Sequence, residues 1–284
     1  MATASRDGSP LLKEFLGRDP EFLPEFWTLF VLGMIIIILR FPVQIRRVGV
    51  KGLEKDDYVG IFTLATWVST MTMVQQVYHH GSNIDVTQEQ VDQLSQSDID
   101  LLIYGSKCQE VAWYCYVSLL WSMKLTILLF YKRLIGHLWH RHVFTMVGIF
   151  ATMSYTAVIL TISLSCRPYP ANWQVQPLPS FECAFKLTNL LVTTSLNIAT
   201  DVAILILALP LLKELNVPII KKIFVMVLLC SGVFVIAAAI MRLVLTLQGA
   251  PSTETINRWG VRECLVGAAA VSDFSFSGTV SLFC

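Results

Sequence analysis

The sequence predicts an all-α membrane protein: a seven-transmembrane helix bundle with six clear spans, an atypical seventh span and the N-terminus outside. Three observations support this fold class: an apolar composition, apolar stretches of membrane-spanning length, and basic residues grouped in alternate connections. Of the 284 residues, 55% are hydrophobic and only 14% are charged, whereas about 25% of an average soluble chain is charged. The lipid bilayer is therefore the expected solvent for most of this surface.

The overall charge excludes one class of partner. Formal net charge is +1, from 21 basic and 20 acidic residues. Because a nucleic-acid interface needs a dense basic face, we expect no nucleic-acid partner. No internal repeat is visible in the sequence. We expect residues 1–24 to form an extracellular N-terminal segment and residues 25–284 to form one transmembrane helix-bundle domain.

Six apolar stretches are long enough to cross about 30 Å of hydrocarbon at about 1.5 Å of helical rise per residue. These predicted spans lie near residues 25–42, 58–78, 108–131, 143–165, 187–212 and 222–247. A seventh segment, 261–284, is apolar in patches but is interrupted by Ser272, Asp273 and Gly278. Hydropathy alone makes this segment a poor span.

Lys and Arg are concentrated in alternate connections, and cytoplasmic loops hold this excess in membrane proteins. The first, third and fifth connections carry Arg46, Arg47, Lys51 and Lys55, then Lys132, Arg133 and Arg141, then Lys213, Lys221 and Lys222. Residues 79–106 contain five acidic residues and neither Lys nor Arg. We therefore expect a multi-pass protein of the plasma membrane with an extracellular N-terminus.

Two charged residues are expected at similar depth in the inner half of the bilayer. They are Lys124 in the third span and Asp201 in the fifth, and each would cost at least about 2.5–3.5 kcal/mol on insertion scales if left without compensation. We hypothesise a buried ion pair, with Asn197 one turn above Asp201 on the same face. Two interpretations are open: the pair only fastens two helices, or it acts directly on a ligand or a proton.

Arg242 belongs to a separate, outer layer of this prediction. It lies near the outer end of the sixth span, where Glu263 at the start of the seventh segment or Glu110 near the start of the third span is a candidate partner. The third span has a polar face at three- and four-residue steps that includes Glu110 and Tyr114. We hypothesise that Glu110, Tyr114, Arg242 and Glu263 line an outward ligand-binding cavity.

His79 and His80 end the second span at its outer surface. Imidazole binds metals and titrates near neutral pH, but no other His or Cys lies at ligand spacing on this element. We therefore expect interfacial anchoring and no metal site. The sequence also shows no nucleophile motif or phosphate-binding loop, so no catalytic residue is assigned.

Four of the seven cysteines are expected at the outer side: Cys108, Cys166, Cys183 and Cys264. Four thiols allow three pairings, and the spacing does not select one. A bond from Cys108 to either loop cysteine would tether the loop between the fourth and fifth spans over the bundle. Cys115 and Cys230 fall inside spans and are expected to act as small packing residues.

Several motifs together resemble the fungal rhodopsin-like seven-transmembrane domain family over roughly residues 40–267. They are the run from Lys124 to Arg133, the outer-loop pattern Cys166, Pro168, Trp173 and Cys183, the pair Asn197 and Asp201 leading to Leu209-Pro210, the Lys221-Lys222 start of the sixth span, Arg242 and Glu263. The resemblance implies a fungal source, a seven-helix bundle and a receptor-like integral membrane protein.

Two departures from the family pattern stand out. No cysteine cluster of the extracellular CFEM type precedes the first span, which indicates a member without that module. After about Gly267, the family's Pro-containing seventh helix and cytoplasmic tail are replaced by an Ala- and Ser-rich segment. We therefore expect a truncated or altered seventh span.

The leading functional prediction is a receptor that senses an extracellular or membrane-borne small ligand and contacts a cytoplasmic signalling partner through the basic cluster at Tyr131-Lys132-Arg133. The alternative is a membrane-embedded enzyme or accessory protein of fungal secondary metabolism that acts on an apolar substrate. Retinal is not expected as a cofactor, because retinal attachment needs a lysine on the last helix and none follows Lys222.

Overall fold

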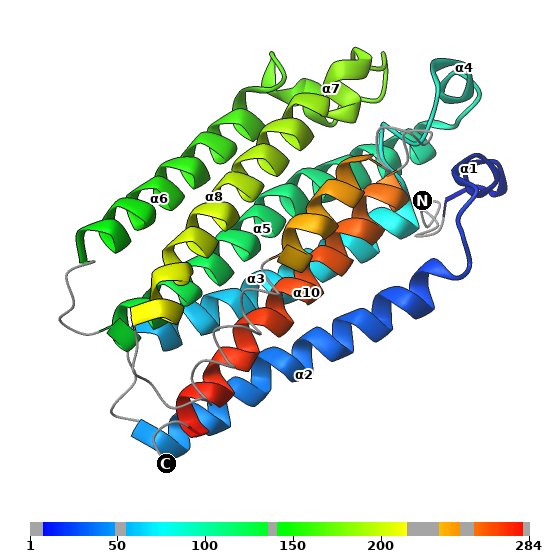
Figure 1. Ribbon diagram of the computed structural model, residues 1–284. Coiled ribbons are helices and arrows are strands. Elements are labelled where there is room, and N and C mark those ends of the chain that lie inside the picture. Colours follow the sequence, from blue (N-terminus) through cyan, green and yellow to red (C-terminus); the bar gives the residue numbers. More distant parts are fainter. Residues whose placement is uncertain (1–7, 49–54, 136–140, 215–232, 245–252, 281–284) are drawn as a thin grey trace.

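The computed structural model describes residues 8–48, 55–135, 141–214, 233–244 and 253–280. Within these ranges the regular structure is entirely helical. Figure 1 shows long helices running side by side as one bundle, with the short elements gathered at one end. The long helices are α2 (Phe22–Val48), α3 (Lys55–His80), α5 (Gln96–Ile135), α6 (Arg141–Leu164), α8 (Leu187–Glu214) and α10 (Thr253–Val280), and a further helical segment runs over Val233–Val244.

The short elements are α1 (Pro10–Leu16), α4 (Gln88–Val91), the 3-10 helix η2 (Tyr169–Asn172) and α7 (Phe181–Phe185). Together with the connections around them, residues 81–95 and 165–186, they form what we call the outer cap, named after the side on which the sequence predicts them to lie. The cap has its own apolar core of Leu12, Val86, Val91, Ile99, Leu102 and Val175. α10 ends at the opposite end of the bundle (Figure 1).

Four of the described helices carry segments long and apolar enough to cross a membrane: Phe22–Leu39, Gln96–Leu129, His142–Leu164 and Cys183–Leu207. α3 is long enough but more polar. Its hydroxyl groups at Thr63, Thr66 and Thr70 are buried, and that of Thr63 donates to Ser122 Oγ of α5 at 3.0 Å. These buried polar residues of α3 therefore contribute to helix packing. They also lower the mean hydropathy of α3, so that hydropathy alone does not identify this helix as a span.

The helix that carries the third predicted span extends beyond that span at its outer end. The sequence predicts 108–131, but α5 begins at Gln96 and has 40 residues, about 60 Å of helix. This length exceeds the hydrocarbon thickness, so the first turns of α5 extend into the outer cap. They stay helical because Ile99 and Leu102 are buried in the cap core.

The helix that contains the seventh segment also begins before the predicted span. α10 begins at Thr253, eight residues before 261, and continues through Gly267 to Val280; residues 281–284 are outside the described ranges. Asp85 accepts a hydrogen bond from the Thr253 backbone N–H at 3.0 Å, which satisfies a free donor of the first turn. Of the sixth predicted span, 222–247, the described part is 233–244.

Close backbone contact between α3 and α5 makes Gly105 a sensitive position. Gly81 ends α3 with φ +76, and a Cβ atom added at Gly105 would overlap the Gly81 carbonyl oxygen. We expect Gly105→Ala to lower the free energy of unfolding by about 1–3 kcal/mol, as for other overpacked sites. Detergent-solubilised protein unfolded by heat or by SDS provides the measurement.

Gly148 in α6 is the matched control, because a Cβ there would meet nothing within 4 Å. Gly148→Ala should leave stability unchanged or raise it by up to about 1 kcal/mol through helix propensity. If both variants behave alike, the close approach of α3 and α5 is contradicted.

Candidate functional site

One connected set of polar and charged side chains occupies the bundle interior. It draws on α5, α8, the segment Val233–Val244 and α10. We call it the interior network, and its members are Tyr116, Lys124, Thr194, Asn197, Asp201, Arg242 and Glu263. Its charged groups are two cations and two carboxylates, so their formal charges cancel.

The inner end of the network lies between α5 and α8. The structure places Lys124 in an ion pair with Asp201, and the same ammonium group donates to the Asn197 backbone carbonyl at 3.1 Å. Lys124 also lies 5.8 Å from the centre of the Trp121 ring. The side chains of Lys124 and Asp201 are 5% and 12% exposed, so the pair is shielded from solvent at both partners.

The outer end of the network joins the Val233–Val244 segment to α10. Arg242 Nε lies 3.0 Å from Glu263 Oε2, and the two side chains are 1% and 0% exposed. The Tyr116 hydroxyl donates to the same carboxylate oxygen at 2.8 Å. The guanidinium carbon of Arg242 is also 5.0 Å from the Tyr116 ring centre. Of its two candidate partners, Arg242 therefore pairs with Glu263.

Asn197 connects the two ends, which the sequence predicts as separate layers. Its side-chain Nδ2 donates to Glu263 Oε1 at 2.9 Å, while its backbone carbonyl accepts from Lys124. The two layers are therefore linked through Asn197. Asn197 has this role because one helical residue can present its side chain to α10 and its carbonyl oxygen to α5.

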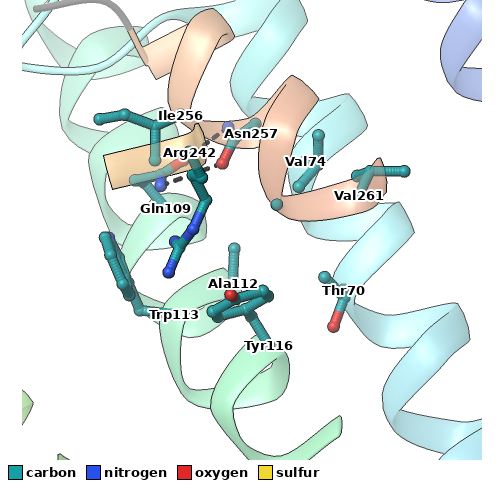
Figure 2. A pocket seen from close by; sticks show the side chains of 11 residues that line it. Thr70, Val74, Gln109, Ala112, Trp113, Tyr116, Arg242, Ile256, Asn257 and Val261 are labelled. Carbon is teal, nitrogen blue, oxygen red and sulfur yellow. Dashed lines mark hydrogen bonds between the residues drawn. The ribbon is translucent and has the colours of Figure 1, made fainter. Parts of the chain in front are cut away.

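A cavity lies beside Arg242 at the outer end of the network, and we call it the Arg242 cavity (Figure 2). About 30 Å³ of it is open to the centres of water-sized molecules, which is room for one or two waters. Figure 2 shows Arg242 projecting into this region near Trp113 and Tyr116. The lining residues are Thr70, Val74, Gln109, Ala112, Trp113, Tyr116, Arg242, Ile256, Asn257, Gly260 and Val261.

An amide pair closes part of this cavity wall. Gln109 of α5 and Asn257 of α10 exchange two hydrogen bonds, with donor–acceptor distances of 3.3 and 3.0 Å. Both residues line the Arg242 cavity. This pair fixes the outer part of α10 against α5 without placing a charge in the wall.

Of the four residues that the sequence analysis grouped at one cavity, Arg242 lines the Arg242 cavity, whereas Glu110, Tyr114 and Glu263 do not. Glu110 forms a buried ion pair with Lys186, and the Tyr114 hydroxyl is 2.9 Å from Ser163 Oγ of α6. The reason is helical geometry, because positions 110 and 114 share a face of α5 that is turned away from the face of positions 109, 113 and 116.

Lys186 is a functional candidate that the sequence analysis missed. It lies in the outer loop just before the fifth predicted span, where an isolated lysine is ordinary. In the structure it is 5% exposed and adopts φ 53 between α7 and α8. The sequence does hold one indication of this contact: Lys186 lies just before the fifth predicted span and Glu110 lies near the start of the third, so the two opposite charges are expected at similar depth.

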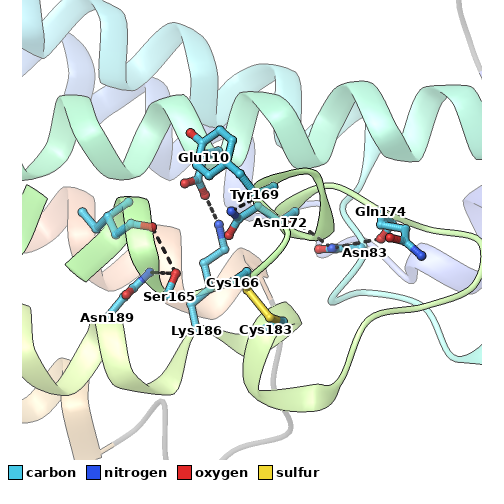
Figure 3. Close-up of a disulfide and its surroundings, with 11 residues drawn as sticks. Asn83, Glu110, Ser165, Cys166, Tyr169, Asn172, Gln174, Cys183, Lys186 and Asn189 are labelled. Atoms are coloured by element: carbon cyan, nitrogen blue, oxygen red, sulfur yellow. Dashed lines mark hydrogen bonds and ion pairs between the residues drawn. A yellow bond between two sulfur atoms is a disulfide. The ribbon is translucent and has the colours of Figure 1, made fainter. Parts of the chain in front are cut away.

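The cap disulfide joins Cys166 to Cys183 with a Cα–Cα distance of 5.5 Å (Figure 3). The tether through Cys108, one of the possibilities that the sequence left open, is not formed, since Cys108 and Cys264 are buried free thiols. The two loop cysteines pair because the loop folds back on itself between α6 and α8. Cys264 is fully buried in α10 beside Glu263, away from the loop.

Ion pairs connect the N-terminal segment to the outer end of the bundle. Arg18 contacts Asp85 at 3.1 Å, and Arg258 of α10 contacts Asp19 at 2.5 Å. The hydrogen bond from Arg258 is the main reason that the pKa of Asp19 lies below its ordinary value. This carboxylate therefore contributes stability above its unfolded-state pKa, and the contribution is lost as the pH falls through its lower folded-state pKa.

The two histidines lie at the end of α3. His80 Nδ1 is 2.8 Å from the Gln76 carbonyl oxygen, and the rings of His79 and His80 contact Tyr78 and Tyr104 edge-on. In the part of the chain that the structure describes, no group of three or more His, Cys, Asp or Glu side chains is arranged to hold a metal ion.

Comparison with known proteins gives one match. The family model described as the fungal rhodopsin domain matches residues 39–272, which includes the whole interior network. Neither a curated protein nor a solved structure matches the chain.

Proposed function

Because this chain belongs to the fungal rhodopsin domain family, we propose that it is a receptor-like multi-pass membrane protein that senses a small extracellular or membrane-borne ligand. The ligand site in this proposal is the Arg242 cavity. The observation that carries the proposal is the interior network, which leads from the wall of this cavity at Arg242 to Asp201 in the inner half.

The proposed topology is seven spans with the outer cap and N-terminus on the extracellular side of the plasma membrane. Support comes from the distribution of charge and from the disulfide. The basic connections follow the C-terminal ends of α2, α5 and α8, which lie at the end of the bundle opposite the cap (Figure 1). The cap holds the Cys166–Cys183 disulfide, and disulfides persist in oxidising compartments.

A ligand in the Arg242 cavity would act on the charge balance of the network. The cavity wall is mostly apolar, and Arg242 brings a cation to it. A polar ligand group that competes with Glu263 for Arg242 would weaken the contacts through which Glu263 holds Asn197. Because Asn197 also contacts Lys124, the change would reach the inner ion pair.

The size of the cavity restricts the proposed ligand. In this conformation it has room for one or two waters, so a larger ligand must displace side chains as it binds. Retinal is excluded from the proposal because no lysine follows Lys222 in the sequence. On the cytoplasmic side, the proposed partner contacts the basic cluster at Tyr131-Lys132-Arg133.

The proposal can be tested in a fungal strain from which the gene has been deleted. The gene is reintroduced in three versions, which encode the wild-type protein, the Tyr116→Phe variant or the Tyr155→Phe variant. Tyr116→Phe removes the hydrogen bond to Glu263. Tyr155→Phe is the matched control, since it removes a bond to Ser118 outside the network; each loss is expected to cost about 0.5–1.5 kcal/mol. We expect a second-messenger response that Tyr116→Phe alters and Tyr155→Phe leaves unchanged at equal expression.

Metabolite profiles of the same cultures separate the two function classes. Unchanged metabolites together with an altered second messenger support the receptor. Loss or accumulation of one compound without a signalling change contradicts it and favours the membrane-embedded enzyme or accessory protein. Equal responses from the Tyr116 and Tyr155 variants would remove the Arg242 cavity from the proposal.

A further inference from the structure

A second cavity lies in the outer cap, and we call it the Lys186 cavity. It is lined by Ser82, Asn83, Ile84, Ser106, Gln109, Trp113, Asn172, Ala184, Phe185, Lys186, Thr253 and Ile256. About 20 Å³ of it is open to the centres of water-sized molecules, enough for one water. It shares Gln109, Trp113 and Ile256 with the Arg242 cavity, so the two cavities are neighbours.

The polar groups around this cavity are unequally satisfied. Lys186 donates to Glu110, the Asn172 amide donates to the Tyr169 carbonyl at 2.9 Å, and the Asn83 amide donates to two backbone carbonyls at 3.2 Å each. Among the lining residues, all of which the structure describes, Asn172 carries a buried side-chain acceptor without a partner, its Oδ1. An occupant that donates a hydrogen bond would satisfy this atom.

The charge of the cavity decides between an ionic and a neutral occupant. Lys186 and Glu110 compensate each other, with side chains 5% and 4% exposed. An added cation or anion would be an unpaired charge in a dry site, which is costly. The rest of the wall offers apolar surface at Trp113 and Ile256. Figure 3 shows Lys186 extended toward Glu110, with Asn172 on the neighbouring loop.

We propose that the Lys186 cavity is a second ligand site, distinct from the Arg242 cavity, for a small neutral molecule that carries a hydroxyl group and an apolar body. The hydroxyl donates to Asn172 Oδ1, and the apolar body lies against Trp113. Such a molecule is larger than the one water for which this conformation has room, so side chains must move as it binds. Its hydroxyl makes the hydrogen bond to Asn172 Oδ1 that a donor-free molecule of the same size cannot make.

Ethanol and its isomer dimethyl ether are the two probe ligands. They contain the same atoms, but only ethanol has a hydroxyl group that can donate a hydrogen bond. Protein with ¹⁵N-labelled tryptophan in lipid nanodiscs is titrated with each. The Trp113 indole signal, assigned by its loss in Trp113→Phe, reports binding. We expect ethanol to bind about five- to tenfold more tightly than dimethyl ether, the factor for one net hydrogen bond.

Two variants locate the preference. Asn172→Leu should abolish it, because leucine has no acceptor for the hydroxyl of the ligand. Thr70→Val changes only the Arg242 cavity and should leave the preference intact. Equal binding of the isomers to wild type, a preference that survives Asn172→Leu, or a preference lost in Thr70→Val would overturn the proposal. The receptor proposal is tested separately by the signalling of Tyr116→Phe.

Discussion

Replacing Glu263 by glutamine is expected to lower the free energy of unfolding by about 3–5 kcal/mol, the range for breaking a buried ion pair at one partner. The Glu263 carboxylate accepts from the Tyr116 hydroxyl and the Asn197 amide and faces Arg242. Glutamine has one acceptor oxygen, so its amide nitrogen must face another donor. Arg242 then remains buried without a compensating charge. SDS-induced unfolding in mixed micelles measures the change.

The Arg242→Met/Glu263→Leu double variant is the control for charge. It removes both ions and leaves neutral groups without their partners: the donors of Tyr116 and Asn197 lose Glu263, and the Thr194 hydroxyl loses Arg242. Replacing a whole buried pair by apolar residues is often neutral, so this variant should recover most of the lost stability. A Glu263→Gln protein as stable as wild type would show that Arg242 has another counter-ion.

The second large effect is expected at Lys124. Lys124→Met leaves the Asp201 carboxylate without its cation and removes the donor to the Asn197 carbonyl. We expect a loss of about 3–5 kcal/mol in the same assay. Leu125 is the matched control, because its side chain is an exposed apolar neighbour on α5 and Leu125→Met should change stability by less than about 0.5 kcal/mol.

The Lys124→Met/Asp201→Leu double variant shows whether the ion pair only joins α5 to α8 or also has a role in signalling. Both charges are gone, so folding should be largely restored. If signalling is lost in this folded protein, the pair has a role beyond joining α5 to α8. Normal signalling would limit Lys124 and Asp201 to packing.

Much of the bundle follows from apolar length, but its outer part does not. Spans such as 143–165 and 187–212 are close to α6 and α8, since a continuous apolar run dictates both helix and burial. The first turns of α5 were not predicted because residues 96–107 include polar residues at both ends, with Asp98 and Asp100 near the start and Lys107 at the end. Ile99 and Leu102 of these turns pack in the cap core with residues distant in sequence, such as Leu12 and Val175, and local hydropathy cannot register such long-range contacts.

The candidate site shows the same division. The pairs Lys124–Asp201 and Arg242–Glu263 could be inferred from the depth of each residue along its predicted helix, because charged residues inside spans have few available partners. Depth does not give rotation about the helix axis, so Glu110 was grouped with Arg242, whereas it pairs with Lys186. The link through Asn197 uses a backbone carbonyl, which no side-chain pattern reveals.

The central claim is that the outer and inner ion pairs form one network through Asn197, and a double-mutant cycle between Glu263→Gln and Lys124→Met tests it most directly. Each single variant leaves one net buried charge, whereas the combination leaves Arg242 and Asp201, whose charges cancel. The combined loss of unfolding free energy is therefore expected to fall short of the sum of the single losses by at least about 1 kcal/mol. Losses that add to within about 0.5 kcal/mol would show two independent pairs and contradict the account.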